Sequence, residues 1–268
     1  MIAGKFYNGS GLGNMLHRLV ATRVKAADLG VDWSMMYIND GAGKEMGFKG
    51  QSFMDIGDWN KPVIQTCNVW QEKKVRENGV DISPFDPEFN FIEDNTIIDG
   101  EFQDERYWEH REKEVNEWLK VENPWKVTFD HNAVVGEDAA YFIPNDLCVI
   151  GFRGGEFALY PDLFLTKDYW DESIKMMREI NPNMRFEVHT DDVDTAFRFF
   201  PDFHIIHDIG LNWRSMRYAK YAIIANSSFF ILPRWLRNGI TISPRFWGRR
   251  NTKVWSMAQN YYKRFQYI

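Results

Sequence analysis

The chain opens with an apolar stretch that runs into a glycine-rich turn, IAGKFYNGSGLGN at residues 2–14. Residues 2–7 predict a short strand. Residues 14–29 predict a helix, and its apolar face consists of Leu16, Leu19, Val20, Val24 and Ala27. A strand, a glycine turn and a helix in this order are typical of the start of a nucleotide-binding domain. The unpaired backbone N–H groups at such a helix start favour a phosphate group.

The second half of the chain alternates between apolar strand candidates and helical segments. Strands are predicted at 147–152, 185–189, 203–207, 222–225 and 240–243, and helices at 167–180, 193–200, 213–221 and 230–237. Strands that alternate with helices predict an α/β fold with a mainly parallel sheet covered on both faces. Ligands bind to such sheets beyond the carboxyl ends of the strands.

The residues between these two parts have weaker patterns. A strand is predicted at 31–38 and a charged helix at 107–121, whereas the glycine-rich region 41–58 fits no element. A boundary at 144–146 predicts a first domain over 1–145 and a second over 146–250. The last segment, 251–268, is predicted to be helical and to pack back on the first domain, so that two sheets face a cleft.

Composition excludes several classes of protein. Of the 268 residues, 44% are apolar and 26% are charged, as in soluble globular proteins, and the net charge of -6 disfavours a general nucleic-acid binder. Basic residues gather from Arg234 to Arg264, and we interpret them as a solvated face. Neither a signal peptide nor an integral membrane segment is predicted. Cys67 and Cys148 both lie in apolar runs, which predicts buried free thiols and a cytoplasmic protein.

Three strand ends carry side chains that suit a diphosphate. Arg153 follows the 147–152 strand and precedes two glycines, so its planar guanidinium can approach a phosphate with paired N–H donors. The turn at 225–229 places Asn226, Ser227 and Ser228 before a helix, as the turn at 11–14 does. Ordinary helix capping and a surface arginine are the alternative interpretations.

Carboxylates near the same strand ends have two interpretations each. Glu156 is a candidate general base or a solvated loop carboxylate. The neighbouring residues Asp191 and Asp192 resemble a metal-binding pair, but an aspartate at a helix start is also the ordinary cap of that helix. Capping is the favoured interpretation, and we predict no metal site. His204 and His207 point to opposite faces of a strand and make a poor metal pair.

Several short motifs follow one another in a fixed order along the chain. They are GLGN (11–14), GEFQDERYW (100–108), GFRGGE (151–156), YWDESI (169–174), HTDD (189–192), IIANSSF (223–229) and ISPRFW (242–247). Their order and content resemble the GDP-fucose-dependent α-1,2-fucosyltransferases, a glycosyltransferase family 11-like pattern that runs through most of the chain.

The resemblance implies a fold of the GT-B type, with two Rossmann-like domains facing a cleft. The donor is expected mainly on the second domain and the acceptor glycan on the first. Arg153 matches the arginine that contacts the diphosphate, Asp192 matches a position near guanine, and Gly13 and Asn14 match the turn that faces the donor. Asn226, Ser227, Ser228 and Phe229 match the turn that supplies further hydrogen-bond donors. The implied reaction is an inverting transfer without an essential metal or another cofactor.

The chain departs from the family pattern in its arginine motif. Gly151 stands where the family has histidine, Gly154 replaces a second arginine, and Glu156 replaces an aspartate. Arg153 and Glu156 are therefore the predicted catalytic pair. The predicted partners are a nucleotide sugar donor, GDP-fucose, and a glycan acceptor. Two alternatives remain open: a glycosyltransferase of the same fold with a different nucleotide sugar, and a non-catalytic glycan- or nucleotide-binding protein.

Overall fold

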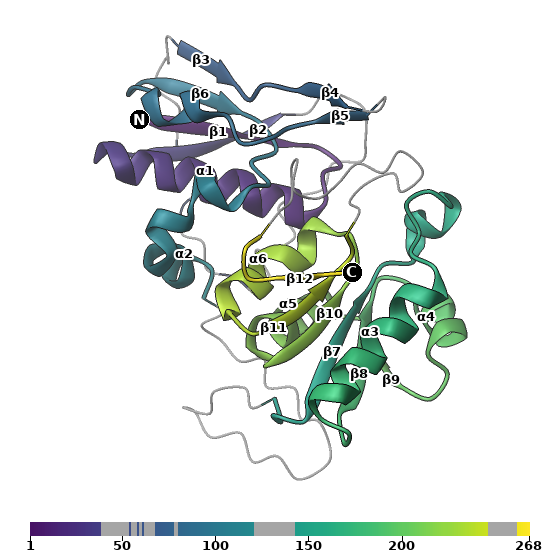
Figure 1. Ribbon diagram of the computed structural model, residues 1–268. Coiled ribbons are helices and arrows are strands. Elements are labelled where there is room, and N and C mark those ends of the chain that lie inside the picture. Colours follow the sequence, from purple (N-terminus) through teal and green to yellow (C-terminus); the bar gives the residue numbers. More distant parts are fainter. Residues whose placement is uncertain are drawn as a thin grey trace.

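The computed structural model describes residues 1–38, 54, 58, 61, 68–77, 80–120, 143–245 and 262–268. These residues form two α/β halves, each built on a parallel sheet (Figure 1). Cys67 and nearly all of the glycine-rich region 41–58 lie outside the described residues.

The first half is built on a parallel sheet with the strand order β2-β1-β6-β3. Its strands are β1 (Ile2–Tyr7), β2 (Trp33–Ile38), β3 (Asn68–Gln71) and β6 (Thr96–Asp99), with β4 (Val75–Glu77) and β5 (Val80–Ile82) as a separate hairpin. Its helices are α1 (Leu12–Leu29), η2 (Pro87–Phe91), η3 (Glu105–Tyr107), η4 (Glu109–Arg111) and α2 (Glu112–Trp118). Gly4 lets α1 approach β1 closely, because a Cβ at that position would collide with Thr22 of α1.

The second half is built on a parallel sheet with the order β12-β11-β10-β7-β8-β9. Its strands are β7 (Leu147–Phe152), β8 (Arg185–Thr190), β9 (His204–Ile206), β10 (Tyr221–Ile224), β11 (Ile240–Ser243) and β12 (Gln266–Tyr267). Its helices are η5 (Gly155–Leu159), α3 (Lys167–Ile180), α4 (Val193–Phe199), α5 (Ile209–Tyr218) and α6 (Ser228–Arg237). The central strands β7 and β10 are almost wholly buried, as expected for a sheet with both faces covered.

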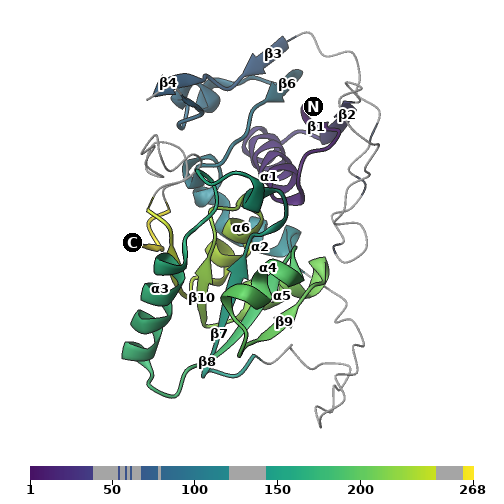
Figure 2. The same cartoon turned by 90° about the vertical axis from the view of Figure 1, so that its right-hand side faces the viewer.

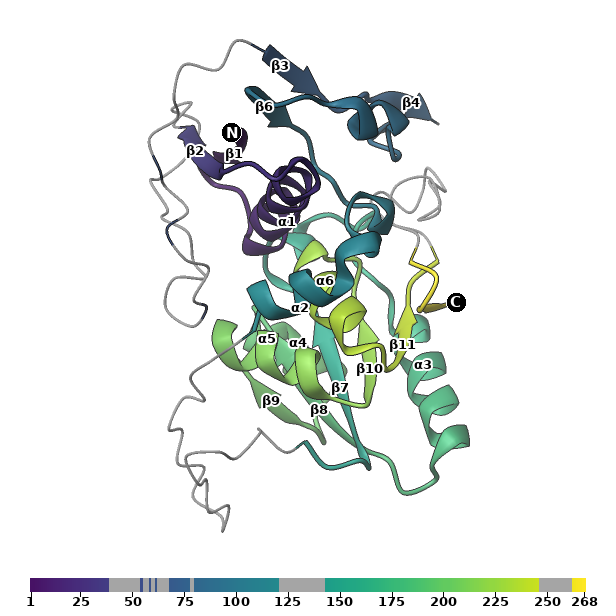
Figure 3. The same ribbon diagram turned by 90° about the vertical axis from the view of Figure 1, so that its left-hand side faces the viewer.

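The two halves meet through helices. Helices α1 and α6 lie between the two sheets and pack on each other, and α2 also touches α6 (Figure 2, Figure 3). The buried apolar residues of both halves form one continuous core. Two parallel α/β halves that face each other in this way constitute the GT-B arrangement, so the predicted fold class is confirmed.

The end of the chain differs from its predicted form. Residues 262–268 form a turn and β12, which pairs with β11 at the edge of the second sheet, instead of a helix. Edge pairing is the physical reason, because β12 satisfies backbone groups that β11 would otherwise expose. The Tyr262 hydroxyl donates to the Gln103 carbonyl (2.7 Å), which ties this segment to the first half. The remainder of 251–268 lies outside the described residues, and the domain boundaries stay a prediction.

The basic residues from 234 onward do not form one solvated face. Arg234 is completely buried, and its guanidinium donates to the carbonyl oxygens of Met216, Ala219 and Ile240 and to the Thr241 hydroxyl. Packing overrides the expected exposure because this side chain cross-links α5, α6 and β11. None of the helices in the described residues is long and apolar enough to cross a membrane.

Candidate functional site

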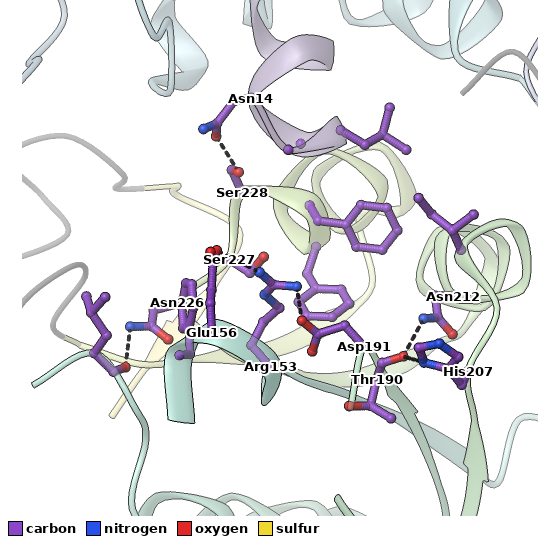
Figure 4. A pocket seen from close by; sticks show the side chains of 18 of the residues that line it. Asn14, Arg153, Glu156, Thr190, Asp191, His207, Asn212, Asn226, Ser227 and Ser228 are labelled. Atoms are coloured by element: carbon purple, nitrogen blue, oxygen red, sulfur yellow. Dashed lines mark hydrogen bonds and ion pairs between the residues drawn. The ribbon is translucent and has the colours of Figure 1, made fainter. Parts of the chain in front are cut away.

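A cavity of about 840 Å³ opens between the two halves, at the carboxyl ends of the strands (Figure 4). The first half contributes Gly9, Gly11, Leu12, Gly13, Asn14 and Gln103. The second half contributes Arg153, Glu156, Phe157, Leu163, Thr190, Asp191, His207, Asp208, Ile209, Asn212, Asn226, Ser227, Ser228, Phe229 and Phe230. The structure thus brings together every predicted site residue except Asp192.

The starts of α1 and α6 meet at this cavity. Gly13 lies directly against the backbone of Ser228 and Phe229, where any Cβ would collide. The Asn14 side-chain oxygen accepts hydrogen bonds from the Ser228 hydroxyl (2.6 Å) and the Gln103 amide (2.8 Å). Gly13 and Asn14 therefore join the halves as well as lining the cavity.

Neither helix start carries a side-chain cap. The N-cap residue of α1 is Gly11, which has no side chain, and the Ser227 side chain at the N-cap of α6 makes no capping hydrogen bond. Uncapped N–H groups and the positive end of a helix dipole favour an anion. Both helix starts therefore favour a negatively charged group in the same cavity.

Arg153 follows β7 and points into the cavity (Figure 4). Its guanidinium pairs with Asp191, approaches a Glu156 oxygen at 3.4 Å and lies over the Phe157 ring at 4.9 Å. The side chain is 25% exposed, and its Nε is buried without a partner. This arrangement fixes the guanidinium while leaving hydrogen-bonding capacity for a ligand.

The structure distinguishes the two residues of the aspartate pair, because Asp191 lines the cavity and Asp192 does not. Asp191 pairs with Arg153 and accepts the Gly154 N–H (3.0 Å). Asp192 turns away to cap α4, where it accepts from the Thr195 N–H (3.0 Å), the Thr195 hydroxyl (2.6 Å) and the Gly155 N–H (3.0 Å). These hydrogen bonds, with that to the Thr195 side chain foremost, lower the pKa of Asp192. The capping interpretation therefore describes Asp192, and its place beside guanine stays a prediction.

Glu156 is more exposed to solvent than Arg153, and Asn226 is less exposed. The Glu156 side chain is 70% exposed at the cavity rim, on η5. Asn226 is only 4% exposed, donates its amide to the Leu163 carbonyl (3.0 Å), and has a buried side-chain oxygen without a partner. A carboxylate open to solvent and a buried amide oxygen offer different chemistry: proton uptake in one case and a fixed hydrogen bond in the other.

The sequence did not indicate one wall of the cavity, formed by Thr190, His207, Asp208 and Asn212. The Thr190 carbonyl accepts from the Asn212 amide (3.2 Å) and lies 3.1 Å from His207 Nδ1. Because a carbonyl only accepts, His207 Nδ1 carries the hydrogen. The position of these residues after β8 and β9 is the sequence signal that could have identified them.

The aspartate side chains near the cavity, among the described residues, already accept hydrogen bonds. No three His, Cys, Asp or Glu side chains there gather as a group that could hold a metal ion. The two Asp191 oxygens already bond Arg153 and Gly154, and those of Asp192 bond the α4 cap.

Comparisons with known proteins give limited matches. No family model matches the chain. The chain is 30% identical over 169 residues to an α-1,2-colitosyltransferase of Escherichia coli, and the match covers 56% of each sequence. The chain thus spans little more than half of that relative.

Two solved structures of E. coli heptosyltransferase WaaC also resemble the chain. The structure with ADP has a TM-score of 0.49 at 12% identity and covers 100% of this chain and 92% of that one. The structure with ADP-2-deoxy-2-fluoro heptose has a TM-score of 0.47 at 11% identity and covers 100% and 93%. The topology of the two parallel sheets defines the fold.

Proposed function

We propose that the protein is an inverting glycosyltransferase that transfers fucose from GDP-fucose to a hydroxyl of a glycan. The observation that carries this proposal is the convergence of Arg153 with the uncapped starts of α1 and α6 on one cavity between the halves. All three features stabilise negative charge, and a nucleoside diphosphate is an anion of suitable size for a cavity of about 840 Å³. The match to a sugar transferase over 169 residues supports the same reaction class.

The proposed chemistry assigns one task to each catalytic side chain. The acceptor oxygen forms a bond to the anomeric carbon while the bond from that carbon to the diphosphate oxygen breaks. The electron pair leaves with the diphosphate, whose charge Arg153 stabilises, and Glu156 takes the acceptor proton. Asp191 holds the guanidinium in place for this task.

The general-base role of Glu156 can be tested separately from donor binding. Because it is 70% exposed and 3.4 Å from Arg153, Glu156→Gln should fold normally and bind GDP with near-normal affinity. Loss of a general base should lower turnover by about a hundredfold to ten-thousandfold. Steady-state transfer rates and GDP titrations of this variant distinguish the two effects. A variant that transfers sugar at the normal rate would remove Glu156 from the mechanism.

The donor sugar has a second candidate. The relative that matches the chain is named for the transfer of colitose, which like fucose is a deoxy sugar. Gly151 and Gly154 depart from the fucosyltransferase motif, and this departure supports a different donor sugar. A colitose donor is therefore the alternative to GDP-fucose within the same reaction.

Transfer assays test the proposed function. The protein is incubated with labelled GDP-fucose, or the corresponding colitose donor, and a panel of neutral oligosaccharides, and the labelled product is measured. Product with either donor supports glycosyl transfer. Nucleotide binding without transfer to any acceptor would instead favour a non-catalytic binding protein.

The absence of an essential metal belongs to the same proposal. Because helix starts and Arg153 provide the positive charge at the cavity, transfer should continue in excess EDTA. Activity lost in EDTA and restored by manganese would show that a metal ion supplies that charge instead.

A further inference from the structure

A second polar group lies at the carboxyl edge of the first sheet, outside the cavity lining. It consists of Lys5 and Tyr7 on β1, Arg18 on α1, Asp99 at the end of β6, and Glu101 just after it; we call it the edge cluster. The proposed donor site uses none of these side chains.

Direct contacts hold the edge cluster together. One Asp99 oxygen accepts from the Tyr7 hydroxyl (2.6 Å) and from Lys5 Nζ (3.1 Å), and the other lies 4.0 Å from Arg18 Nη1. Arg18 Nη2 donates to Glu101 (2.8 Å), and its guanidinium lies over the Tyr7 ring at 4.7 Å. Two cations balance two carboxylates, so the cluster has no net charge.

The cluster is incompletely satisfied. Arg18 is 6% exposed, yet its Nε and Nη1 are buried without hydrogen-bond partners, as is Glu101 Oε2. Buried polar atoms in native proteins usually have partners, and a missing one is unfavourable by about 1–3 kcal/mol. The cluster therefore combines unpaired donors on Arg18 with an unpaired acceptor on Glu101, and both residues belong to the same ion pair.

The loop after β6 is held in a strained form. Phe102 has a φ of 51°, in the left-handed region that bulky residues rarely adopt. The Glu72 carboxylate accepts from the Glu101 N–H (2.6 Å) and the Phe102 N–H (3.3 Å), and Glu72 fills the space that a side chain at Gly100 would need. Such strain is typical of functional segments, and here the Glu72 carboxylate holds the backbone at Glu101 and Phe102 in place.

Three chain segments lead from the edge cluster to the cavity wall within a few residues. Tyr7 precedes Gly9, Glu101 precedes Gln103, and Asn14 lies one helical turn before Arg18 on α1. Gly9, Asn14 and Gln103 line the cavity. The cluster therefore lies next to the first-half wall of the cavity that holds the proposed donor site.

We propose that the edge cluster is the acceptor subsite and binds neighbouring hydroxyl groups of a neutral sugar through Glu101, Asp99 and Arg18. A hydroxyl both donates and accepts, so it matches carboxylates that accept beside a guanidinium that donates. The absence of net charge disfavours a phosphate or carboxylate ligand. This assignment rests on the proposed function, because it places a hydroxyl-bearing acceptor beside the donor cavity.

Ligand-observed NMR titrations test the subsite directly. The probes are the methyl glycosides of glucose, galactose and mannose, with glucuronate as the anionic comparison, each measured with and without GDP. At least one neutral glycoside should bind, and glucuronate should bind more weakly. Preferred binding of glucuronate, or no binding of any neutral glycoside, would overturn the proposal.

A conservative variant and a matched control locate the binding. Glu101→Gln should weaken the binding of that glycoside about tenfold or more, because a charge-assisted hydrogen bond is lost, and should leave GDP affinity within about twofold. Glu112→Gln removes a carboxylate that also pairs with an arginine, Arg264, but lies outside the cleft lining, and it should change neither affinity. Unchanged glycoside binding by Glu101→Gln would overturn the assignment.

The outcomes separate this proposal from the proposed function. Glycoside binding that depends on Glu101 in a protein that binds neither GDP nor a nucleotide sugar would support the subsite and contradict the donor site. Normal GDP binding, together with glycoside binding that Glu101→Gln leaves unchanged, would support the donor site and contradict the subsite. Tyr7→Phe provides a second test, since it removes only the hydroxyl that holds Asp99 and should weaken the same glycoside.

Discussion

At the scale of single residues, Arg153 is the side chain on which the proposed transfer depends most. It is one-quarter exposed and its contacts are to other cavity residues, so few contacts of the core depend on it. Arg153→Ala should lower turnover by about a hundredfold to a thousandfold, because a donor aimed at developing charge is removed. Its Tm without ligand should stay near that of the wild type.

Arg153→Lys separates charge from geometry at this position. Lysine keeps the positive charge but lacks the planar fork of donors, so this variant should remain strongly impaired. Kinetics and thermal unfolding of both variants provide the measurement. An alanine variant that transfers sugar at a near-normal rate, or that fails to fold, would show that the arginine is incidental or structural.

Arg234 has the opposite character, because it is structural and entirely buried. Burial lowers its pKa to about 9, and three backbone carbonyls and one hydroxyl accept its hydrogen bonds. Arg234→Met should reduce the free energy of unfolding by at least about 3 kcal/mol, since each carbonyl left without a donor is unfavourable by about 1–3 kcal/mol. Urea unfolding measures this loss.

The matched control for Arg234 is Arg185→Met. Arg185 pairs with Asp146 at the surface, with its side chain 60% exposed, and such pairs contribute about 0–1 kcal/mol. Equal losses in the two variants would contradict the structural role of Arg234.

At the scale of elements, the contact between α1 and α6 depends on the absence of a side chain at Gly13. A Cβ at Gly13 would collide with the backbone of Ser228 and Phe229, whereas a Cβ at Gly11 would meet open space. Gly13→Ala should therefore lower the free energy of unfolding by about 1–3 kcal/mol and weaken GDP binding, because it pushes apart the two helix starts that line the cavity.

Gly11→Ala is the control for that variant. It changes the same turn without an overlap, so its stability and GDP affinity should stay close to those of the wild type. Thermal unfolding and GDP titration of both variants check this contrast. A Gly13→Ala protein that matches Gly11→Ala would contradict the close packing of α1 on α6.

His17, near the start of α1, makes the stability of the folded protein depend on pH. It is fully buried, its Nδ1 lies 2.7 Å from the Gly13 carbonyl and therefore carries the hydrogen, and burial lowers its pKa from 6.5 to about 4. As the pH falls below 6.5, His17 becomes protonated in the unfolded chain, whereas in the folded protein it stays neutral down to about pH 4. Stability from neutral His17 is thus complete above pH 6.5 and should decline by about 3 kcal/mol toward pH 4.

Unfolding curves between pH 7 and pH 4 test this linkage. The wild type should lose stability more steeply than His17→Gln over this range. His110→Gln, at a surface histidine beside Asp28, should keep the steep dependence. Identical slopes for the wild type and His17→Gln would contradict a buried neutral His17.

At the scale of the whole molecule, the sequence predicted the central elements of the second sheet closely. The bounds of β7 and α3 match the predicted 147–152 and 167–180, because β7 is a continuous apolar run and α3 carries apolar residues at helical spacing. The strands β3 and β6 were missed, since both are short and β3 is largely exposed, which leaves little periodic pattern.

The candidate site was predictable where its residues follow strands directly. Arg153, Asn226 and the 11–14 turn were identified from that position alone. Gln103 was missed because a loop holds it, and that loop's form depends on Glu72, about thirty residues earlier in the chain. The sequence could not distinguish Asp191 from Asp192, because capping contacts decide which of two neighbouring side chains faces the cavity.

The affinity for GDP, measured by isothermal titration calorimetry, tests the central claim most directly. The wild type should bind GDP more tightly than UDP or CDP. Arg153→Ala should bind GDP about tenfold to a hundredfold more weakly, because it lacks a charge-assisted contact to the diphosphate. Arg185→Ala, at the opposite end of the second sheet, should bind GDP like the wild type. Equal GDP affinity in the wild type and Arg153→Ala, or no nucleoside diphosphate binding at all, would contradict the account.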